Sequence, residues 1–255
     1  MFETGLVQGL LCSMLIVFCT TAALDGGESS PIEHTLWDEL LQNHVSEDGL
    51  VDYRGLMSDT VKLNQYLNVL SQNHPNDSWS ESEQLAFWIN AYNAFTVKLI
   101  LKHYPVSSIK DIKRGIPFVN TVWDIKFIEI GNRTYDLNKI EHGIIRKHFD
   151  EPRIHFAINC ASISCPTLAG YAYIATDLDT QLDQAAFAFI NDPKRNQIQS
   201  GEVKLSKIFS WFSGDFKKSA PSIREFVNRY AKTKIPASAD IDYLDYDWSL
   251  NEVKP

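Results

Sequence analysis

Apolar residues that recur three and four positions apart predict most of the helices of this chain. The pattern runs through Ile32–Val45 and Asp59–Gln72, and it predicts an amphipathic helix in each segment. Three further helices are predicted over Asp177–Ile190, Ile208–Phe216 and Ser222–Tyr230.

The segment that follows Ser80 predicts the longest and most deeply buried helix. Ser80 and Glu83 have the spacing of a capping box, in which the Ser80 side chain accepts from the Glu83 amide and the Glu83 side chain returns to the Ser80 amide. The helix is expected to run to about His103 and to end before Pro105. Its interior, LAFWINAYNAFTVKLIL, is apolar on nearly every side, so the helix should lie inside a core.

Extended segments predict a small sheet beside these helices. Trp123–Ile130 alternates and is expected to pair with Arg133–Tyr135 across a turn at Gly131-Asn132, after which Asp136 caps a helix over Leu137–His148. Further extended pieces are predicted at Leu50–Tyr53, Arg153–Cys160 and Val203–Leu205. The expected fold is α+β: a single domain whose buried central helix packs on a small mixed or antiparallel sheet. With 255 residues, 44% of them hydrophobic, the chain can bury a sizeable core.

The N-terminal segment predicts export. Residues 6–23 form an apolar run that ends at Thr21-Ala22-Ala23, small residues of the kind found at a signal-peptidase site. The expected division is therefore a signal peptide at 1–23, a linker at 24–35, the domain at 36–236 and an acidic, aromatic tail at 237–255 packed on the domain. The protein is expected to be periplasmic or extracellular. The alternative is an uncleaved signal that anchors it to a membrane, because the run approaches spanning length.

The composition and the absence of several sequence motifs exclude some classes of function. A formal net charge of −8 without a basic run argues against nucleic-acid binding. The chain has no G-x-G-x-x-G, no phosphate loop, no G-x-S-x-G elbow, no H-E-x-x-H and no C-x-x-C. We therefore expect no nucleotide partner, no metal and no other cofactor.

The buried helix carries one cluster of candidate residues, Asn90, Tyr92 and Asn93. Asn90 and Asn93 share a helix face, and buried carboxamides need hydrogen-bond partners. Two interpretations remain open. The pair either holds a loop in place, or it lines a cleft and orients a substrate or catalytic group.

A second cluster, Glu141, His142 and Arg146, lies on the next predicted helix. His142 and Arg146 are neighbours at i,i+4, and an imidazole at the edge of an apolar face can act as a general base. The alternative is a packed histidine beside surface ion pairs.

The third cluster, R-I-H-F-A-I-N-C-A-S-I-S-C-P at 153–166, holds both cysteines outside the signal. In a strand, His155 and Cys160 would point to opposite faces, so His155 is expected to be a core histidine and His142 to meet Cys160. An imidazole beside Cys160 would favour its thiolate. Small residues such as Ser162 leave room for a substrate, and the turn's amides could bind an oxyanion. A disulfide between Cys160 and Cys165 is the alternative.

Seven segments in order resemble the Domain of Unknown Function 547 family over about residues 36–230. They are W-D-E-L-L-Q-N-H-V, V-D-Y, A-F-W-I-N-A-Y-N-A-F, Y-P-V-S-S-I, I-E-H-G-I-I-R, R-I-H-F-A-I-N-C-A-S-I-S-C-P and W-F-S-G-D-F. The resemblance implies an exported protein without an assigned activity. The family motifs place Asp215 with the residues named above, among them Arg146 and Cys165.

Two functions fit these residues. By analogy with papain-like and transglutaminase-like enzymes, Cys160 is the nucleophile and His142 the base of a thiol-dependent amide hydrolase or acyl-transferase of the cell envelope, with Glu141, Asn93 or Asp215 orienting the imidazole. Asn90, Tyr92, Asn93, Arg146, His155, Ser162 and Asp215 would then serve the substrate, a peptide or a cell-envelope component. The alternative is a non-catalytic binding or scaffold domain stapled by a Cys160–Cys165 disulfide.

Overall fold

The helix that follows Ser80 is the centre of the fold. In the computed structural model, which describes residues 29–112, 121–199 and 202–254 besides Met1, it runs over Glu81–His103 (α4). The predicted capping box is present, and sixteen residues of the helix are buried, on every side of it. The predicted signal peptide at 1–23 lies outside the described residues.

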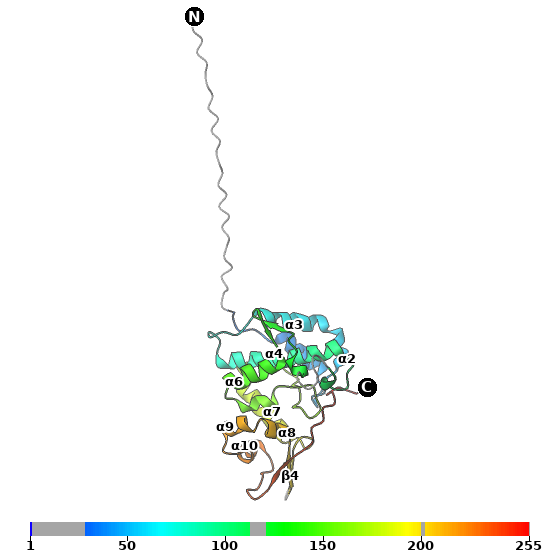
Figure 1. The fold of residues 1–255 in the computed structure, drawn as a ribbon, viewed down its shortest axis with the longest axis vertical. Coiled ribbons are helices and arrows are strands. Elements are labelled where there is room, and N and C mark those ends of the chain that lie inside the picture. Colours follow the sequence, from blue (N-terminus) through cyan, green and yellow to red (C-terminus); the bar gives the residue numbers. More distant parts are fainter. Residues whose placement is uncertain (2–28, 113–120, 200–201, 255) are drawn as a thin grey trace.

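Helices surround α4 in the half of the molecule that contains it (Figure 1). The N-terminal helices are α1 (Thr35–His44), α2 (Tyr53–Ser58) and α3 (Thr60–Gln72). On the other side lie α5 (Leu137–Ile140), the π-helical turn η3 (Glu141–Ile145) and α6 (Arg146–His148), which follow one another without a break and span the helix predicted over Leu137–His148. The extended piece predicted over Leu50–Tyr53 is present up to Asp52, with Val51 in β-bridges to Val45 and Glu252, and only Tyr53 belongs to a helix. Asp52 accepts from the Gly55 amide and so starts α2 at Tyr53.

The C-terminal half holds the remaining helices: α7 (Leu178–Ile190), α8 (Lys207–Trp211), α9 (Ser213–Ser219) and α10 (Ile223–Tyr230). The helix predicted over Ile208–Phe216 is thus two short helices that meet at Phe212. Short 3-10 turns lie at η1 (Ile109–Asp111), η2 (Val122–Asp124) and η4 (Pro152–Phe156).

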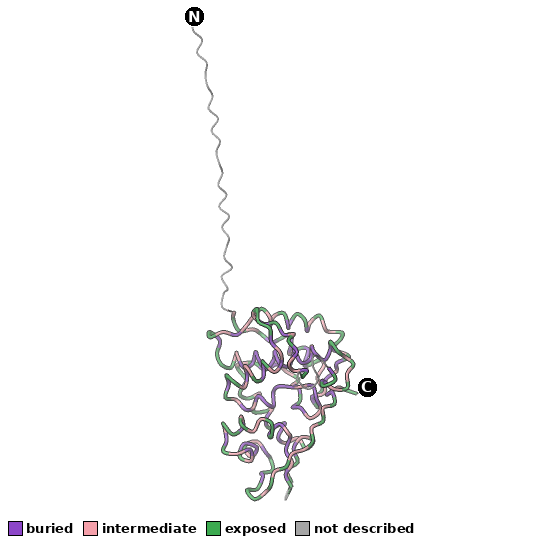
Figure 2. The backbone as a smooth tube through the Cα atoms, in the orientation of Figure 1, coloured by how far each residue is buried: buried purple, intermediate pink, exposed green. Residues whose placement is uncertain are grey.

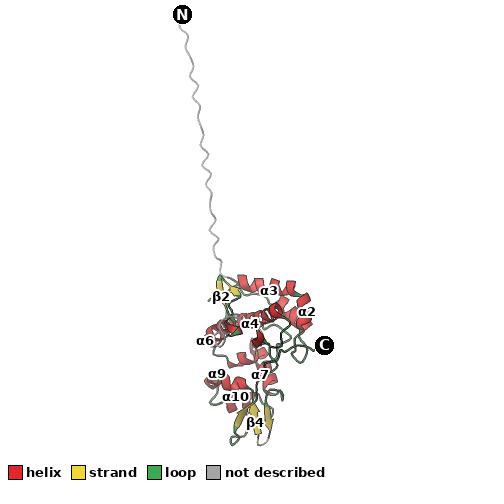
Figure 3. Ribbon diagram, turned by 45° about the vertical axis from the view of Figure 1, so that its right-hand side comes forward, coloured by secondary structure: helices red, strands yellow, loops and turns green. Residues whose placement is uncertain are grey.

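The structure describes two small sheets, which lie at opposite ends of the folded molecule with most of the helices between them (Figure 3). β1 (Ile128–Ile130) and β2 (Arg133–Tyr135) form the predicted antiparallel hairpin. Its turn has positive φ at Gly131 (57°) and Asn132 (60°), as a two-residue hairpin turn requires. The predicted strand Trp123–Ile130 is shorter than expected, because Thr121 and Asp124 cap each other and close η2.

The second sheet has three strands in the order β3-β4-β5. β3 (Gln197–Gln199) is antiparallel to β4 (Glu202–Leu205), and β5 (Ile241–Tyr243), from the C-terminal tail, is parallel to β4. The predicted α+β class is therefore confirmed, with the strands divided between two small sheets and α4 packed chiefly on helices α2, α3 and α5.

Buried side chains form two hydrophobic clusters, and Figure 2 shows buried backbone in both halves. The larger cluster surrounds α4 and includes Tyr92, Ile140 and Ile158. The smaller one joins α7 to α10 with β4 and includes Phe156 and Ile208. The segment 156–158 thus passes from one cluster to the other.

Among the residues that the structure describes, no helix is long and apolar enough to cross a membrane.

Candidate functional site

A cavity of about 200 Å³ brings together most of the residues predicted to carry chemistry. We call it the cysteine cavity. Its polar lining consists of Asn138, Glu141, His142 and His155, with Tyr92, Cys160 and Cys165 beside them. Ile158 of the larger hydrophobic cluster and Ile208 of the smaller one both line it, so the cavity lies where the two clusters meet.

Aromatic side chains form one wall of this cavity. The rings of Tyr246 and Trp248 lie 4.5 Å apart, Trp211 lies 4.8 Å from Tyr246, and Trp123 lies 5.6 Å from Trp248. Trp211 is 48% exposed although it is large and apolar. The wall therefore offers apolar contact area to a ligand that enters from solvent.

Cys160 is partly exposed and lines the cavity at the end of segment 153–160. Its Sγ lies 3.3 Å from the Ser162 Oγ and 3.4 Å from the Tyr246 hydroxyl. Both cysteines are free thiols in the structure. The backbone N–H of Cys160 donates to the Sγ of Cys165 over 2.8 Å.

These contacts separate the acidities of the two thiols. Hydrogen bonds with Cys165, Ser162 and Tyr246 favour the thiolate and lower the pKa of Cys160. Burial raises the pKa of Cys165, which is 3% exposed, well above its ordinary value. Cys160 is therefore the more acidic thiol of the pair.

The turn that holds the cysteines is fixed by side chains. Asn159 accepts from the Ala161 amide over 2.8 Å and donates to the Pro166 carbonyl over 2.6 Å, so it spans the turn. Ala161 has a φ of 59°, a left-handed conformation that a non-glycine residue adopts only when its surroundings enforce it.

Four amides of the cysteine turn donate elsewhere and do not serve the expected oxyanion, whereas the Ser162 amide donates toward the Cys160 sulfur and helps to lower its pKa. The amides of Cys160 and Ala161 donate to Cys165 and Asn159 within the turn. Those of Ile163 and Ser164 donate to carbonyls of the C-terminal tail, at Ser249 and Asp247. These four donors are therefore engaged in holding the turn and the tail together.

The predicted strand Arg153–Cys160 is wrong, and this changes the position of His155. Pro152 starts the 3-10 helix η4, the Glu151 carboxylate caps the Arg153 amide, and the chain then continues as an irregular segment. The apolar run reads as a strand in sequence because it passes through the core and is buried on all sides. Since the backbone is not extended, His155 and Cys160 both line the cysteine cavity instead of facing opposite ways.

His155 is anchored at one ring nitrogen only. Its Nε2 lies 2.8 Å from Oδ2 of Asp215, which also accepts from Nε of Arg146 over 2.6 Å. The buried Nδ1 has no hydrogen-bond partner among the residues that the structure describes. Because Asp215 receives the proton of Nε2, Nδ1 is left as an acceptor.

Burial decides the charge of this histidine. Desolvation lowers the pKa of His155 to about 4, although the neighbouring Asp215 carboxylate opposes the shift. The ring is therefore neutral near pH 7. Burial would raise the pKa of Asp215, but its hydrogen bonds with His155 and Arg146 outweigh that effect and hold it well below the usual range.

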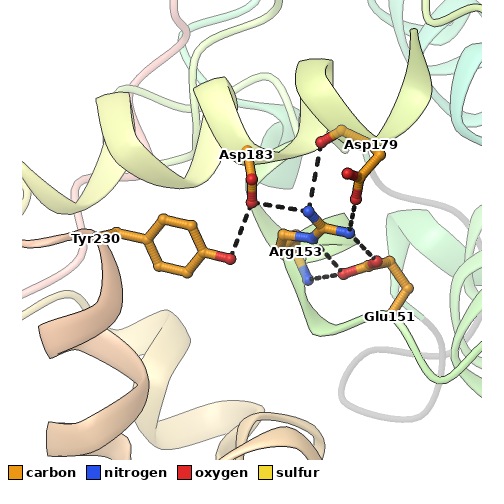
Figure 4. A network of polar contacts seen from close by, with 5 residues as sticks. All are labelled: Glu151, Arg153, Asp179, Asp183 and Tyr230. Atoms are coloured by element: carbon orange, nitrogen blue, oxygen red, sulfur yellow. Dashed lines mark hydrogen bonds and ion pairs between the residues drawn. The ribbon is translucent and has the colours of Figure 1, made fainter.

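A charge network holds η4 in place (Figure 4). The Arg153 guanidinium binds Glu151 on its own segment and Asp179 and Asp183 on α7, with its N atoms 2.5 to 2.8 Å from the carboxylate oxygens. Tyr230 of α10 donates to Asp183 over 3.0 Å. Arg153 thus fixes η4 against α7 and, through Asp183, against α10.

Glu141 is the most perturbed carboxyl group of the cavity. It begins the π-helical turn η3 and is 7% exposed. Burial, followed by the negative charge of Cys160, raises the pKa of Glu141 to about 7, against the opposing effects of Arg146 and a hydrogen bond with Tyr92. A carboxyl group with this pKa can both donate and accept a proton at neutral pH.

His142 lies nearer the solvent than expected for a partner of Cys160. Its side chain is 44% exposed, and its Nδ1 lies 2.9 Å from Nη1 of Arg146 and 3.7 Å from the Glu141 carboxylate. Since the guanidinium can only donate, this ring nitrogen accepts. Partial burial and the charge of Arg146 lower the pKa of His142.

The asparagines of α4 bind backbone rather than line the cavity. Asn90 exchanges two hydrogen bonds with the backbone of Tyr173, over 2.7 and 3.0 Å. Asn93 donates to the Ala157 carbonyl over 2.9 Å and accepts from the Asn159 amide over 2.8 Å. Both therefore attach the long irregular segments around the cysteine turn to the central helix.

Ser162 is 1% exposed and contacts the Cys160 thiol, while Arg146 and Asp215 support His155 from outside the set of lining residues. The lining residues that sequence reasoning did not assign to the site include Asn138 and four aromatic residues, Trp123, Phe212, Tyr246 and Trp248. The concentration of aromatic residues in the tail is the signal that marks two of them.

No group of three or more His, Cys, Asp or Glu side chains suited to a metal ion occurs within 29–112, 121–199 and 202–254.

The central part of the chain matches a known protein family. Residues 76–190 match the family described as "Protein of unknown function, DUF547". This part of the chain is a DUF547 domain. The match contains the cavity residues Tyr92, Glu141, His142, His155, Cys160 and Cys165. No curated protein and no solved structure matches the chain.

Proposed function

We propose that this DUF547 protein is a thiol-dependent amide hydrolase or acyl-transferase of the cell envelope, with Cys160 as its nucleophile. The observation that carries the proposal is the shared cavity of Cys160 and Glu141. A thiol whose pKa is lowered by three hydrogen bonds and a carboxyl group with a pKa of about 7 line the same space. These are the two groups that amide cleavage needs.

The proposal assigns proton transfer to Glu141 instead of His142. An acid–base group works best when its pKa is near the working pH, and Glu141 meets this condition. The pKa of His155 is too low for it to hold a proton there, and His142 is turned toward Arg146.

The reaction then has two balanced steps. The Cys160 thiolate attacks the carbonyl carbon, the C–N bond breaks, and protonated Glu141 gives its proton to the leaving amine. Water next attacks the thioester, its proton returns to Glu141, and the thiolate leaves. An amine or hydroxyl acceptor in place of water turns the same steps into acyl transfer.

His155 supplies a fixed acceptor in this scheme. With its Nε2–H directed to Asp215, its unpartnered Nδ1 can accept a hydrogen bond from the substrate N–H or from the attacking water. The aromatic wall of Trp211, Tyr246 and Trp248 contributes apolar contacts to the acyl group.

The alternative, a non-catalytic binding or scaffold domain, would use the same cavity without turnover. The exposed Trp211 of the aromatic wall favours ligand binding under either proposal. A stapling disulfide is not required by this alternative, since the turn is braced by Asn159.

Two acyl donors with different leaving groups test the enzyme proposal. The protein is incubated with p-nitrophenyl acetate and with an acyl p-nitroanilide, and the acylated residue is located by mass spectrometry. We expect a thioester on Cys160 with both donors and none in Cys160→Ala. Glu141→Gln should react normally with the ester, whose leaving group needs no proton, and at least about tenfold more slowly with the anilide.

Acylation of denatured protein at the same rate, or equal turnover by Cys160→Ala, would contradict the proposal. Tight binding of ligands without any acyl intermediate would favour the scaffold alternative.

A further inference from the structure

The two cysteines of the cavity differ in access and lie in direct contact. Cys160 is partly exposed, whereas Cys165 is 3% exposed and lies behind it. Cys165 Sγ accepts from the backbone nitrogen of Cys160 over 2.8 Å. Since N–Cα is about 1.5 Å, this sulfur lies within roughly 4.3 Å of the Cys160 Cα. That is the neighbourhood a disulfide partner occupies.

The turn keeps the sulfurs adjacent by contacts that do not involve them. Asn159 bridges the ends of the turn, and Arg195 donates to the carbonyls of Cys165 and Ile163 over 2.8 and 3.1 Å. Ile163 and Ser164 are further tied to the C-terminal tail. The backbone that positions the cysteines is therefore held independently of their redox state.

We propose that Cys160 and Cys165 form a dithiol that exchanges with small disulfides, Cys160 attacking and Cys165 resolving. This activity goes beyond the proposed acyl transfer, because it requires Cys165 and an electron transfer. It uses the same Cys160 thiolate.

The exchange balances with a small aliphatic disulfide as the oxidant. The Cys160 thiolate attacks one sulfur of R–S–S–R, the S–S bond breaks, and one R–S⁻ leaves, which gives Cys160–S–S–R. Cys165 loses its proton to the medium and attacks the Cys160 sulfur, and the second R–S⁻ leaves. Counted from the dithiol, the protein loses two protons and two electrons, and the oxidant takes them up to become two thiols.

The acidities of the two thiols suit these roles. The attacking thiol must be a thiolate in the resting state, and hydrogen bonds lower the pKa of Cys160. The resolving thiol should remain protonated until the mixed disulfide forms, and burial raises the pKa of Cys165. In the mixed disulfide the negative charge on Cys160 is gone, which removes one of the effects that raise the Cys165 pKa.

Oxidised glutathione and intact-mass spectrometry test the proposal on the reduced full-length protein, in which Cys12→Ser and Cys19→Ser are present throughout so that Cys160 and Cys165 are the remaining thiols. The wild type should lose two hydrogens and retain no glutathione. Cys165→Ser, which keeps a hydroxyl beside Cys160, should instead accumulate one glutathione per chain at Cys160. Cys160→Ser should remain unmodified at Cys165.

A displaced thiol is the matched control. In the double variant Cys165→Ser, Ser164→Cys the new thiol lies one residue away, on a side chain position that contacts the Asp247 amide. We expect the glutathione adduct to persist there, as in the single variant. Circular dichroism melting of each variant separates loss of folding from loss of exchange.

A stable glutathione adduct on the wild type, or a wild type that does not react at all, would overturn the proposal. The proposed acyl transfer fails separately, because thioester formation with p-nitrophenyl acetate requires Cys160 but not a thiol at position 165.

Discussion

The backbone N–H of Cys160 donates to the Sγ of Cys165 over 2.8 Å, so the partly exposed cysteine and its buried neighbour are hydrogen-bonded across a single turn. Ser162 and Tyr246 complete the surroundings of the Cys160 sulfur. The acidity of Cys160 thus depends on groups from the turn and from a tail 86 residues away in the sequence.

The first prediction concerns Tyr246. Its hydroxyl helps to lower the pKa of Cys160, so Tyr246→Phe should raise that pKa. The rate of alkylation by iodoacetamide at pH 6 should fall about three- to tenfold, since a hydrogen bond to a charged group contributes about 1.5 kcal/mol or less in a partly exposed site. Tyr243→Phe, on β5, is the control and should alkylate like the wild type. An unchanged rate in Tyr246→Phe would show that the hydroxyl does not stabilise the thiolate.

The second prediction concerns Glu141 and the pH dependence of stability. Burial raises the pKa of Glu141 from an ordinary 4.5 to about 7 in the folded protein. The protonated Glu141 carboxyl group therefore contributes about 3 kcal/mol to the free energy of unfolding. This contribution is fully present below pH 4.5 and is lost as the pH rises through 7. Glu141→Gln should remove this pH-dependent contribution to stability, because glutamine does not titrate.

Urea unfolding of wild type and Glu141→Gln at pH 5 and pH 8 measures the effect as a difference between proteins. The comparison is needed because His155, whose pKa is lowered to about 4, contributes a dependence of opposite sign between pH 4 and 6.5. Parallel curves for the two proteins would mean that Glu141 is not a buried neutral carboxyl.

The third prediction concerns Asn93. Its carboxamide makes two buried hydrogen bonds to the backbone at Ala157 and Asn159, next to the cysteine turn. Asn93→Ala leaves both backbone groups unsatisfied and should destabilise the protein by about 2 to 4 kcal/mol in urea unfolding. Asn64→Ala removes only an exposed contact with Lys98 and should cost less than about 0.5 kcal/mol. Equal effects would refute a bracing role for Asn93.

The fourth prediction concerns Asp215, which binds both Arg146 and His155. Asp215→Asn leaves a partly buried guanidinium without its counter-ion and should cost about 3 kcal/mol at pH 7. Because the pKa of Asp215 is lowered by these partners, its contribution is present above about pH 3.8 and declines as the pH falls below that. The gap between variant and wild type should therefore narrow in acid.

Chemical denaturation from pH 7 down to pH 3 provides this measurement. Asp150→Asn is the matched control, since Asp150 forms an exposed pair with Lys218 and its loss should be nearly neutral. A stability difference between wild type and Asp215→Asn that widens in acid would contradict a lowered pKa of Asp215.

The sequence by itself determined those elements whose signals are local. The capping box of Ser80 and Glu83, the turn at Gly131-Asn132 and the N-cap at Asp136 each depend on residues within a few positions, and all three form as predicted. The family motifs likewise identified part of the cavity lining, including Glu141 and Cys160.

Tertiary structure alone decided how those residues meet. An apolar run buried on all sides has the same pattern in a strand and in an irregular core segment, so the sequence could not reveal that η4 turns His155 toward the cavity of Cys160. The pairing of His155 with Asp215, 60 residues later, and the aromatic wall built from Trp123, Trp211 and Trp248 arise only from packing. The raised pKa of Glu141 is likewise decided by the tertiary structure, because the burial of its carboxyl group depends on every element around it.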